Sequence, residues 1–361
     1  MGSPILETHS VEELADLYGD YITSGMSQRE YCRDKGFSRS SLRRRIRAYE
    51  ELLGKRLGRV GVPEKDEFEI ETELHDEVAD LDEIKDKRKR EFSRKHKAKD
   101  ARKLISCKVN IDGPIGILHM GDNHVDDPGT DLAMLERHVE LIQDTEGLFG
   151  ANVGDMANHW VGRLARLHAH QTTTEAETWR LVEWIITSVD WLYLIGGNHD
   201  LWVGNGDPIK WMVRGQSGVY EAHGARIQLR FPNGANVIVN ARHDWPGHSM
   251  WNSAHGPSRA IQRGVTDHIV IAGHKHVSGY QILKNPLSGR ISHALRVGSY
   301  KIYDEYADAL GLSDSRISSS VLTIIDPYKD DTDPGMINVF HDVETGVEFL
   351  NFLRAKHAGD F

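Results

Sequence analysis

The sequence predicts a layered α/β domain that is preceded by a small all-α module. From about Cys107 onward, short apolar segments alternate with longer stretches of helical periodicity, whereas residues 1–57 show helical periodicity alone. Several apolar segments end directly at a cluster of Gly, Asp or His residues. Ligand sites of layered α/β domains lie at the carboxyl ends of strands, so these clusters predict the position of a site.

Residues 1–57, the N-terminal module, are expected to form three short helices. Ser10 with Glu13, and Ser27 with Glu30, match the capping box that satisfies free N–H groups at a helix start. The second helix is expected to end at the glycine of the sequence KGFS, and a third helix follows this turn. The segment resembles a helix-turn-helix of the transposase or terminase type.

The third helix predicts contact with nucleic acid. Between positions 38 and 47 it carries no acidic residue and five arginines, which are Arg39, Arg43, Arg44, Arg45 and Arg47. A recognition helix uses arginine to contact phosphates and guanine edges. We expect this module to bind nucleic acid, and a solvated basic helix of an interaction domain is the alternative.

Residues 58–106 are expected to form a charged linker and a basic arm. From Glu64 to Glu83 there are eleven acidic residues against one basic residue, and from Lys85 to Lys103 there are eleven basic residues against three acidic ones. Few apolar residues interrupt either block, so the first is interpreted as a solvated linker and the second as a helical arm. The arm is either a second contact to nucleic acid or a solvated charged helix.

Residues 107–361 are expected to form the layered domain. The predicted strands are 115–120, 148–153, 191–195, 236–240, 268–272, 293–297 and 321–325, and the predicted helices are 130–146, 174–189 and 257–263. Four tryptophans of this domain are expected in its core: Trp160, Trp179, Trp184 and Trp191.

Composition excludes several classes of protein. No apolar run approaches the roughly 20 residues that span a bilayer, and the first residues lack the pattern of a secretory signal. Only Cys32 and Cys107 are cysteines, so no disulfide framework is indicated and a reducing cytoplasm is expected. The net charge of −10 does not by itself favour nucleic acid, but the charge is strongly segregated along the chain.

Five clusters of potential metal ligands follow the predicted strands. They are Gly121-Asp122-Asn123-His124, Gly154-Asp155, Gly197-Asn198-His199-Asp200, His243-Asp244 and Gly273-His274-Lys275-His276. Imidazole, carboxylate and amide ligands suit a first-row divalent cation. Alternate strand residues share a face, so Asp122 with His124, and His274 with His276, are each expected to converge. Two ions about 4 Å apart can clamp a phosphoryl group and lower the pKa of a bridging water.

The ordered set D-x-H, G-D, G-N-H-D, H and G-H-x-H resembles the calcineurin-like metallophosphoesterase family, to which the Mre11 and SbcD nucleases belong. The resemblance covers residues 110–325. It implies a metallophosphoesterase-like layered β-sandwich flanked by helices. It also implies two divalent transition-metal ions, with Mn²⁺ favoured and iron, zinc and nickel as alternatives.

The family pattern assigns roles to residues of this chain. It implies that one metal is held by Asp122, His124 and His276, the second by Asn198, His243 and His274, and that Asp155 bridges them. His248 stays open as an alternative to His243. His199 resembles the family's non-ligand histidine, which donates a proton to the leaving oxygen. An imidazole that titrates at about pH 6.5 can do this at neutral pH.

One departure from the family pattern bears on the substrate. Protein phosphatases of the family carry G-D-x-x-D-R-G at the second motif, where this chain has GDMANHW. Asn158 therefore replaces the aspartate that would orient the catalytic histidine, and no arginine follows. This argues against a protein serine/threonine phosphatase and leaves the support of His199 open.

The combined pattern predicts a metal-dependent phosphodiesterase that acts on nucleic acid. A DNA nuclease is favoured, with nucleic acid as partner and no membrane. Such a pairing of modules suits a phage or mobile-element protein. The alternatives are a phosphoesterase for small or cyclic nucleotides, and a DNA-binding or assembly protein whose metal site is secondary.

Overall fold

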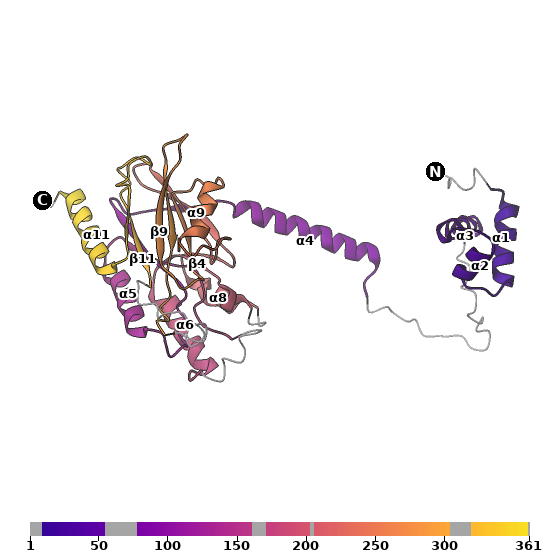
Figure 1. The fold of residues 1–361 in the computed structure, drawn as a ribbon, viewed down its shortest axis with the longest axis horizontal. Helices are drawn as coiled ribbons and strands as arrows, with labels where there is room; N and C mark the ends of the chain where they lie inside the picture. The colour runs from indigo at the N-terminus through magenta and orange to yellow at the C-terminus, as the bar shows by residue number, and fades with distance from the viewer. Residues whose placement is uncertain (1–8, 55–77, 161–170, 203–205, 304–318, 360–361) are drawn as a thin grey trace. The chain divides into compact units, whose positions relative to one another are not determined.

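The computed structural model describes residues 9–54, 78–160, 171–202, 206–303 and 319–359. The chain divides into two compact units, Met1–Ile84 and Lys85–Phe361 (Figure 1). No helix within the described ranges is both long enough and apolar enough to cross a membrane.

The first unit contains the three helices that the sequence predicts. They are α1 (Val11–Thr23), α2 (Gln28–Asp34) and α3 (Arg39–Leu53). Both capping boxes are present, at Ser10 and at Ser27, because each serine accepts the N–H of a glutamate that bonds back to it. Tyr21, Tyr31 and Leu42 bury a small core between the helices. The module is therefore all-α.

Helix α4 (Leu81–Ala101) follows, and none of its residues is buried. It confirms that the basic segment is helical, and it begins within the last residues of the acidic run. The rest of the predicted linker lies largely outside the described residues. A helix that is polar on every side stays solvated unless a partner covers it.

Two six-stranded sheets form the centre of the second unit. In spatial order, sheet A contains β1 (Ile105–Lys108), β6 (Ala225–Arg230), β7 (Asn236–Ala241), β8 (Ile269–Ala272), β10 (Ile291–Arg296) and β9 (Gly279–Lys284). Sheet B contains β12 (Ile337–Phe340), β11 (Val321–Ile325), β2 (Ile115–Met120), β3 (Leu148–Asn152), β4 (Trp191–Ile195) and β5 (Val219–Glu221). All seven predicted strands are present, with strand ends within two residues of those predicted.

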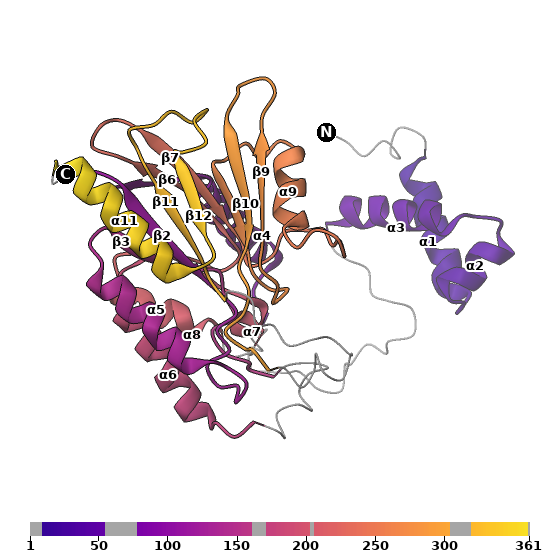
Figure 2. The same cartoon turned by 60° about the vertical axis from the view of Figure 1, so that its left-hand side comes forward.

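Helices cover the outer faces of the two sheets (Figure 2). Sheet B is covered by α5 (Leu132–Asp144), α6 (Glu175–Ser188) and α11 (Val343–Ala358), and sheet A by α9 (His255–Gln262). Apolar side chains such as Ile117 and Val239 fill the space between the sheets, and Leu118 and Ile185 lie between sheet B and its helices. The fold is thus mixed α/β, with two sheets flanked by helices, as predicted.

The order of the strands brings the predicted clusters to the ends of adjacent strands. In sheet B, β2, β3 and β4 are parallel neighbours, and three of the clusters follow them. In sheet A, β7 and β8 are parallel neighbours, and the other two clusters follow these. Strand β11, from much later in the chain, pairs with β2 in antiparallel orientation and places β2 in the interior of sheet B.

Candidate metal centre

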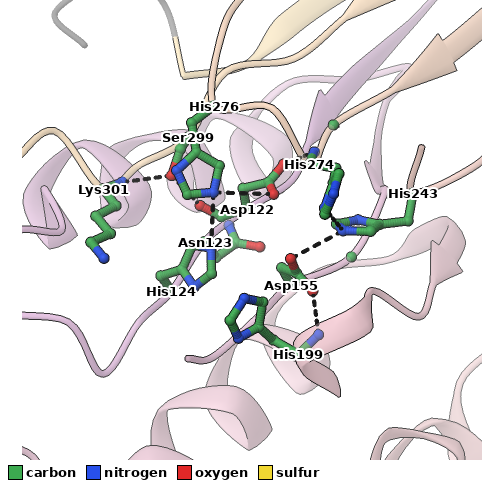
Figure 3. A network of polar contacts seen from close by, with 12 residues as sticks. Asp122, Asn123, His124, Asp155, His199, His243, His274, His276, Ser299 and Lys301 are labelled. Atoms are coloured by element: carbon green, nitrogen blue, oxygen red, sulfur yellow. Dashed lines mark hydrogen bonds and ion pairs between the residues drawn. The ribbon is translucent and has the colours of Figure 1, made fainter. Parts of the chain in front are cut away.

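The structure brings six of the seven predicted ligands together in two groups (Figure 3). The first group is Asp122, His124 and His276, and the second is Asp155, His243 and His274; the ligand atoms of each group lie within 4.8 Å of one another. The amide oxygen of Asn198 is 3.0 Å from Nε2 of His243 and so joins the second group. His248 is exposed and belongs to neither group.

Five of these residues have a left-handed backbone. The φ angles are 49° at Asp122, 42° at His124, 56° at Asp155, 69° at His274 and 52° at His276. Such angles are uncommon outside glycine and cost about 1–3 kcal/mol each, so the surrounding structure must impose them. The sequence predicted that strand alternation would bring these side chains together. The left-handed loops bring them together instead. Both strands have ended, β2 at Met120 and β8 at Ala272, and the loops turn the side chains inward.

Hydrogen bonds between neighbouring loops hold this backbone. The N–H of Asp122 donates to the carbonyl of Gly154 at 2.8 Å, and the N–H of His124 donates to the carbonyl of Asp155 at 3.2 Å. In the other sheet, the N–H of Gly273 donates to the carbonyl of His243 at 3.0 Å. The loops are therefore fixed to one another by their main chains, which leaves the side chains available for other contacts.

Each of the two carboxylates uses one oxygen as an anchor and directs the other into the centre. Oδ2 of Asp122 accepts the N–H of His274 at 2.7 Å, and Oδ1 of Asp155 accepts the N–H of His199 at 2.9 Å. The second oxygen of Asp122 is buried without a hydrogen-bond partner among the described residues. Oδ2 of Asp155 lies 3.0 Å from Nε2 of His243.

The atoms that face one another in the centre are mostly acceptors, which fits a bound cation. Nδ1 of His243 donates to the carbonyl of Val153 at 2.8 Å, so Nε2 presents a lone pair once the ring gives up its second proton, as it would on binding a metal. That lone pair faces the oxygens of Asp155 and Asn198, each at 3.0 Å. In the first group, Nε2 of His124 lies 3.2 Å from Nε2 of His276. Buried acceptors without donors are costly, and positive charge placed between them removes that cost.

The electrostatics of the centre indicate the same demand for positive charge. Burial lowers the pKa of His243, but the Asp155 carboxylate outweighs burial and raises the pKa to about 10. Burial and the neighbouring His276 hold the pKa of His124 well below its usual value, which keeps this imidazole in the neutral form that binds metal. The charge of Asp155 acts on the pKa values of both histidines, so this carboxylate lies near both groups.

Two glycines permit the close approach of the carboxylates. A Cβ atom on Gly197 would lie 2.1 Å from Oδ1 of Asp155, and one on Gly273 would lie 2.3 Å from Oδ2 of Asp122. Any side chain at either position would displace a ligand, so these glycines are required by the geometry of the centre.

His199 lies beside the two groups and belongs to neither. Its ring centroid is 5.2 Å from that of His124, in an edge-on arrangement. Its Nδ1 donates to the backbone carbonyl of Asn158, which leaves Nε2 as the nitrogen that can exchange a proton. The side chain of Asn158 donates instead to Asp127, at 2.9 Å. The missing aspartate of the family pattern is thus replaced by a main-chain carbonyl.

Trp160 does not lie in the core, contrary to the prediction. It is half-buried, its ring centroid is 6.2 Å from that of His199, and Nζ of Lys301 lies 5.1 Å from the Trp160 ring. Lys301 also forms an ion pair with Asp127 at 2.9 Å. Trp191 is buried as predicted, and Trp179 and Trp184 pack against the core under sheet B. Trp160 differs because it follows the Asp155 loop rather than a strand or helix that faces the core.

Two further residues support the centre although sequence reasoning gave them no role. Asp200 accepts the N–H groups of Asp155 at 2.8 Å, Met156 at 3.0 Å and Gly197 at 2.8 Å. Burial and the neighbouring Asp155 raise the pKa of Asp200 to about 7. Asp200 is the last residue of the motif G-N-H-D, so its place in this motif could have indicated its role.

Arg296, at the end of β10, is 1% exposed and joins two ligand loops. It donates to the carbonyl of Gly273 and, at 3.2 Å, to Asp244. Arg296 is distant in sequence from both loops, so the sequence carried no signal for this role.

The arginines of the N-terminal module lie mainly on the surface of α3. Arg39, Arg43, Arg44 and Arg47 are exposed, whereas Arg45 is half-buried with its guanidinium 4.9 Å from the ring centroid of Phe37. Positions 39, 43 and 47 share one face of the helix because they are four residues apart. Residues 35–38 connect α2 to α3, which is the turn length of a helix-turn-helix.

Comparisons with known proteins found similar solved structures. No family model matches the chain, and no curated protein matches it. The solved structure of Vacuolar Protein Sorting 29 from Cryptosporidium parvum is 16% identical, covering 63% of this chain and 97% of its own, with a TM-score of 0.35. The calcineurin-like phosphoesterase YfkN from Bacillus subtilis is 12% identical, covering 67% of this chain and 99% of its own, with a TM-score of 0.34. A predicted phosphoesterase from Streptococcus pneumoniae is 14% identical, covering 64% and 99%, with a TM-score of 0.29. The likeness to these three structures concerns the fold alone.

Proposed function

We propose that this chain is a two-metal phosphodiesterase of the calcineurin-like kind that acts on nucleic acid, with DNA as the favoured substrate. The observation that carries the proposal is the pair of ligand groups, assembled from five loops whose acceptor atoms face one another. Carboxylate, imidazole and amide oxygen ligands suit Mn²⁺, iron, zinc or nickel. When bound, two such ions activate a water and neutralise the charge on a phosphoryl group.

The position of each residue in the centre suggests its role. Asp122, His124 and His276 would hold one ion, and Asn198, His243 and His274 the other. Asp155, whose charge acts on both groups, is the ligand that would be shared. His199, held by the Asn158 carbonyl and outside both groups, is positioned to donate a proton to the leaving oxygen.

The exposed arginines of α3 support nucleic acid as the substrate. Guanidinium groups bind phosphates and guanine edges, and four of the five arginines are exposed on a single 15-residue helix. A small nucleotide carries few phosphates and would not need such a surface on a separate helix.

A substrate panel tests the proposal. After loading with manganese, elemental analysis should find two ions per chain, and the protein should hydrolyse a chromogenic phosphodiester in preference to the matching monoester. It should also cleave labelled DNA, with RNA as the comparison. At most one ion per chain would count against a shared Asp155. Hydrolysis restricted to small or cyclic nucleotides would place the alternative substrate class first.

A further inference from the structure

One face of α4 carries a stripe of cations, which we call the α4 stripe. It consists of Lys87, Arg90, Arg94 and Lys97. These positions fall at i, i+3, i+7 and i+10, so they share one face of the helix and span about 15 Å. All four are exposed, and within the described ranges none forms an ion pair or hydrogen bond with another side chain. By contrast, Arg88 and Lys89, on another face, are each paired with a carboxylate at 3.0 Å.

The register of sheet A places the C-terminal end of this helix at the end of the sheet where the metal centre lies. Strand β7 ends at Ala241, two residues before His243, and Ala241 pairs in antiparallel orientation with Ala225 at the start of β6. Strand β1 runs parallel to β6, with Ile105 opposite Ile227. The start of β1, which follows α4 after three residues, therefore lies at the same edge as His243.

Sheet B gives the same result independently. Arg102, just after α4, forms an ion pair with Glu221, the last residue of β5. Glu221 lies opposite Ile195, the last residue of β4, which is followed by Asn198 and His199. Two sheets thus place the C-terminal end of α4 beside the loops that carry the metal ligands.

We propose that the α4 stripe binds the sugar–phosphate backbone of the nucleic acid whose phosphodiester enters the metal centre. The proposal rests on the proposed function for the nature of the substrate. A length of about 15 Å matches about four phosphates along one strand of a duplex, which carries one charge per about 3.4 Å. Because the C-terminal end of α4 lies beside the metal centre, a nucleic-acid strand that is bound along the α4 stripe would lead to that centre.

Two variants of the full-length protein test the stripe. The stripe variant combines Lys87→Gln, Arg90→Gln, Arg94→Gln and Lys97→Gln. The control variant combines Lys85→Gln, Arg88→Gln, Lys89→Gln and Lys99→Gln, which removes the same charge from other faces of α4. Glutamine keeps helix propensity close to that of lysine and arginine, so both helices should form, which circular dichroism checks. Binding of a labelled DNA duplex is measured by anisotropy in EDTA at several salt concentrations.

The stripe variant should bind DNA at least about tenfold more weakly, and its plot of log affinity against log salt should be flatter by about 3–4. The control variant should change affinity and slope much less. Both should hydrolyse the small chromogenic diester at the wild-type rate, because no metal ligand is altered. Equal losses in the two variants, or no loss in the stripe variant, would overturn the proposal.

The outcome separates the stripe from the proposed function. If the wild-type protein cleaves DNA and the stripe variant binds DNA normally, the proposal about the α4 stripe is wrong and the proposed nuclease function is retained. If the stripe variant loses binding while the wild-type protein cleaves no nucleic acid, the stripe binds nucleic acid but does not present it to the centre, and both the nuclease function and that part of the proposal are wrong.

Discussion

At the scale of single residues, His199 and Asp155 adjoin the same centre and differ in what they contact. His199 lies outside both ligand groups, whereas Asp155 lies in the second group and near the first. The variant His199→Ala should therefore lose most turnover, by about 10²–10⁴-fold, and keep both ions. Steady-state kinetics with the chromogenic diester, beside elemental analysis of the same preparation, measure the two effects.

Two companion variants make this prediction specific. Asp155→Ala should lose metal and activity together. Asn158→Ala should keep turnover within about tenfold of the wild-type rate, because His199 is held by the backbone carbonyl of residue 158 rather than by its side chain. Loss of both ions from His199→Ala would mean that this histidine is a ligand.

The residues that come together in the two groups could be predicted from the sequence because their chemistry and order are local signals. Each stands within a few residues of a strand end, and Asp122 and His124 are close neighbours in the chain. Their left-handed backbone could not be predicted, since it depends on hydrogen bonds to the Gly154 and Asp155 carbonyls on another loop. Arg296 and Trp160 were missed for the same reason: their contacts join segments distant in sequence.

At the scale of elements, the sequence predicted every interior strand of the two sheets except β6, and it missed the four edge strands. Strands β1, β9, β5 and β12 are the four edges, and none of them was predicted. The side chains of β1 and β9 alternate between half-buried and exposed, and those of β5 and β12 are half-buried apart from Ile337. By contrast, β2, β8 and β11 are buried throughout. A strand that is solvated on one side carries polar residues, so its apolar signal is too weak to distinguish it from a loop.

Strand β10 illustrates how an element positions the centre, because an arginine stands at each end of it. Arg296 joins the Gly273 and Asp244 loops, whereas Arg290 pairs with Asp331 at 2.8 Å. The variant Arg296→Met should lose about 1–3 kcal/mol of stability, since the Gly273 carbonyl loses this donor within the core. It should also bind the second manganese ion more weakly, because Gly273 precedes His274. Thermal unfolding and a manganese titration measure both effects.

Arg290→Met is the matched control for this prediction. Its ion pair with Asp331 is about one-third exposed on both sides and touches no ligand loop, so both effects should be smaller. If the two variants bound manganese equally well, Arg296 would have no part in positioning the His274 loop.

At the scale of the whole molecule, the proposed nucleic-acid contact of α3 lies in a different unit from the candidate metal centre. Substituting Arg43, Arg44 and Arg47 of α3 together by glutamine should weaken binding to long DNA without altering either ligand group. Loss of three phosphate contacts would flatten the dependence of log affinity on log salt by about 3. Hydrolysis of the small diester should stay at the wild-type rate. Titrations of duplex DNA at several salt concentrations measure the change.

The matched control removes three cations from the same module outside α3. Arg29, Arg33 and Lys35 lie on α2 and in the turn after it. Their joint replacement by glutamine should change the slope less than the α3 substitutions do. Equal slopes for wild-type protein and the α3 variant would show that α3 does not bind nucleic acid.

The place of β11 in sheet B has a consequence for how the chain is synthesised. Strand β2 lies between β3 and β11, and β11 is made only after nearly all of the other strands. Until β11 leaves the ribosome, β2 has an unpaired edge although its side chains are apolar and destined for burial, which is a surface that chaperones recognise and that aggregates. The loop after β2 carries Asp122 and His124, so we expect this loop to reach its final position only after β11 has paired with β2.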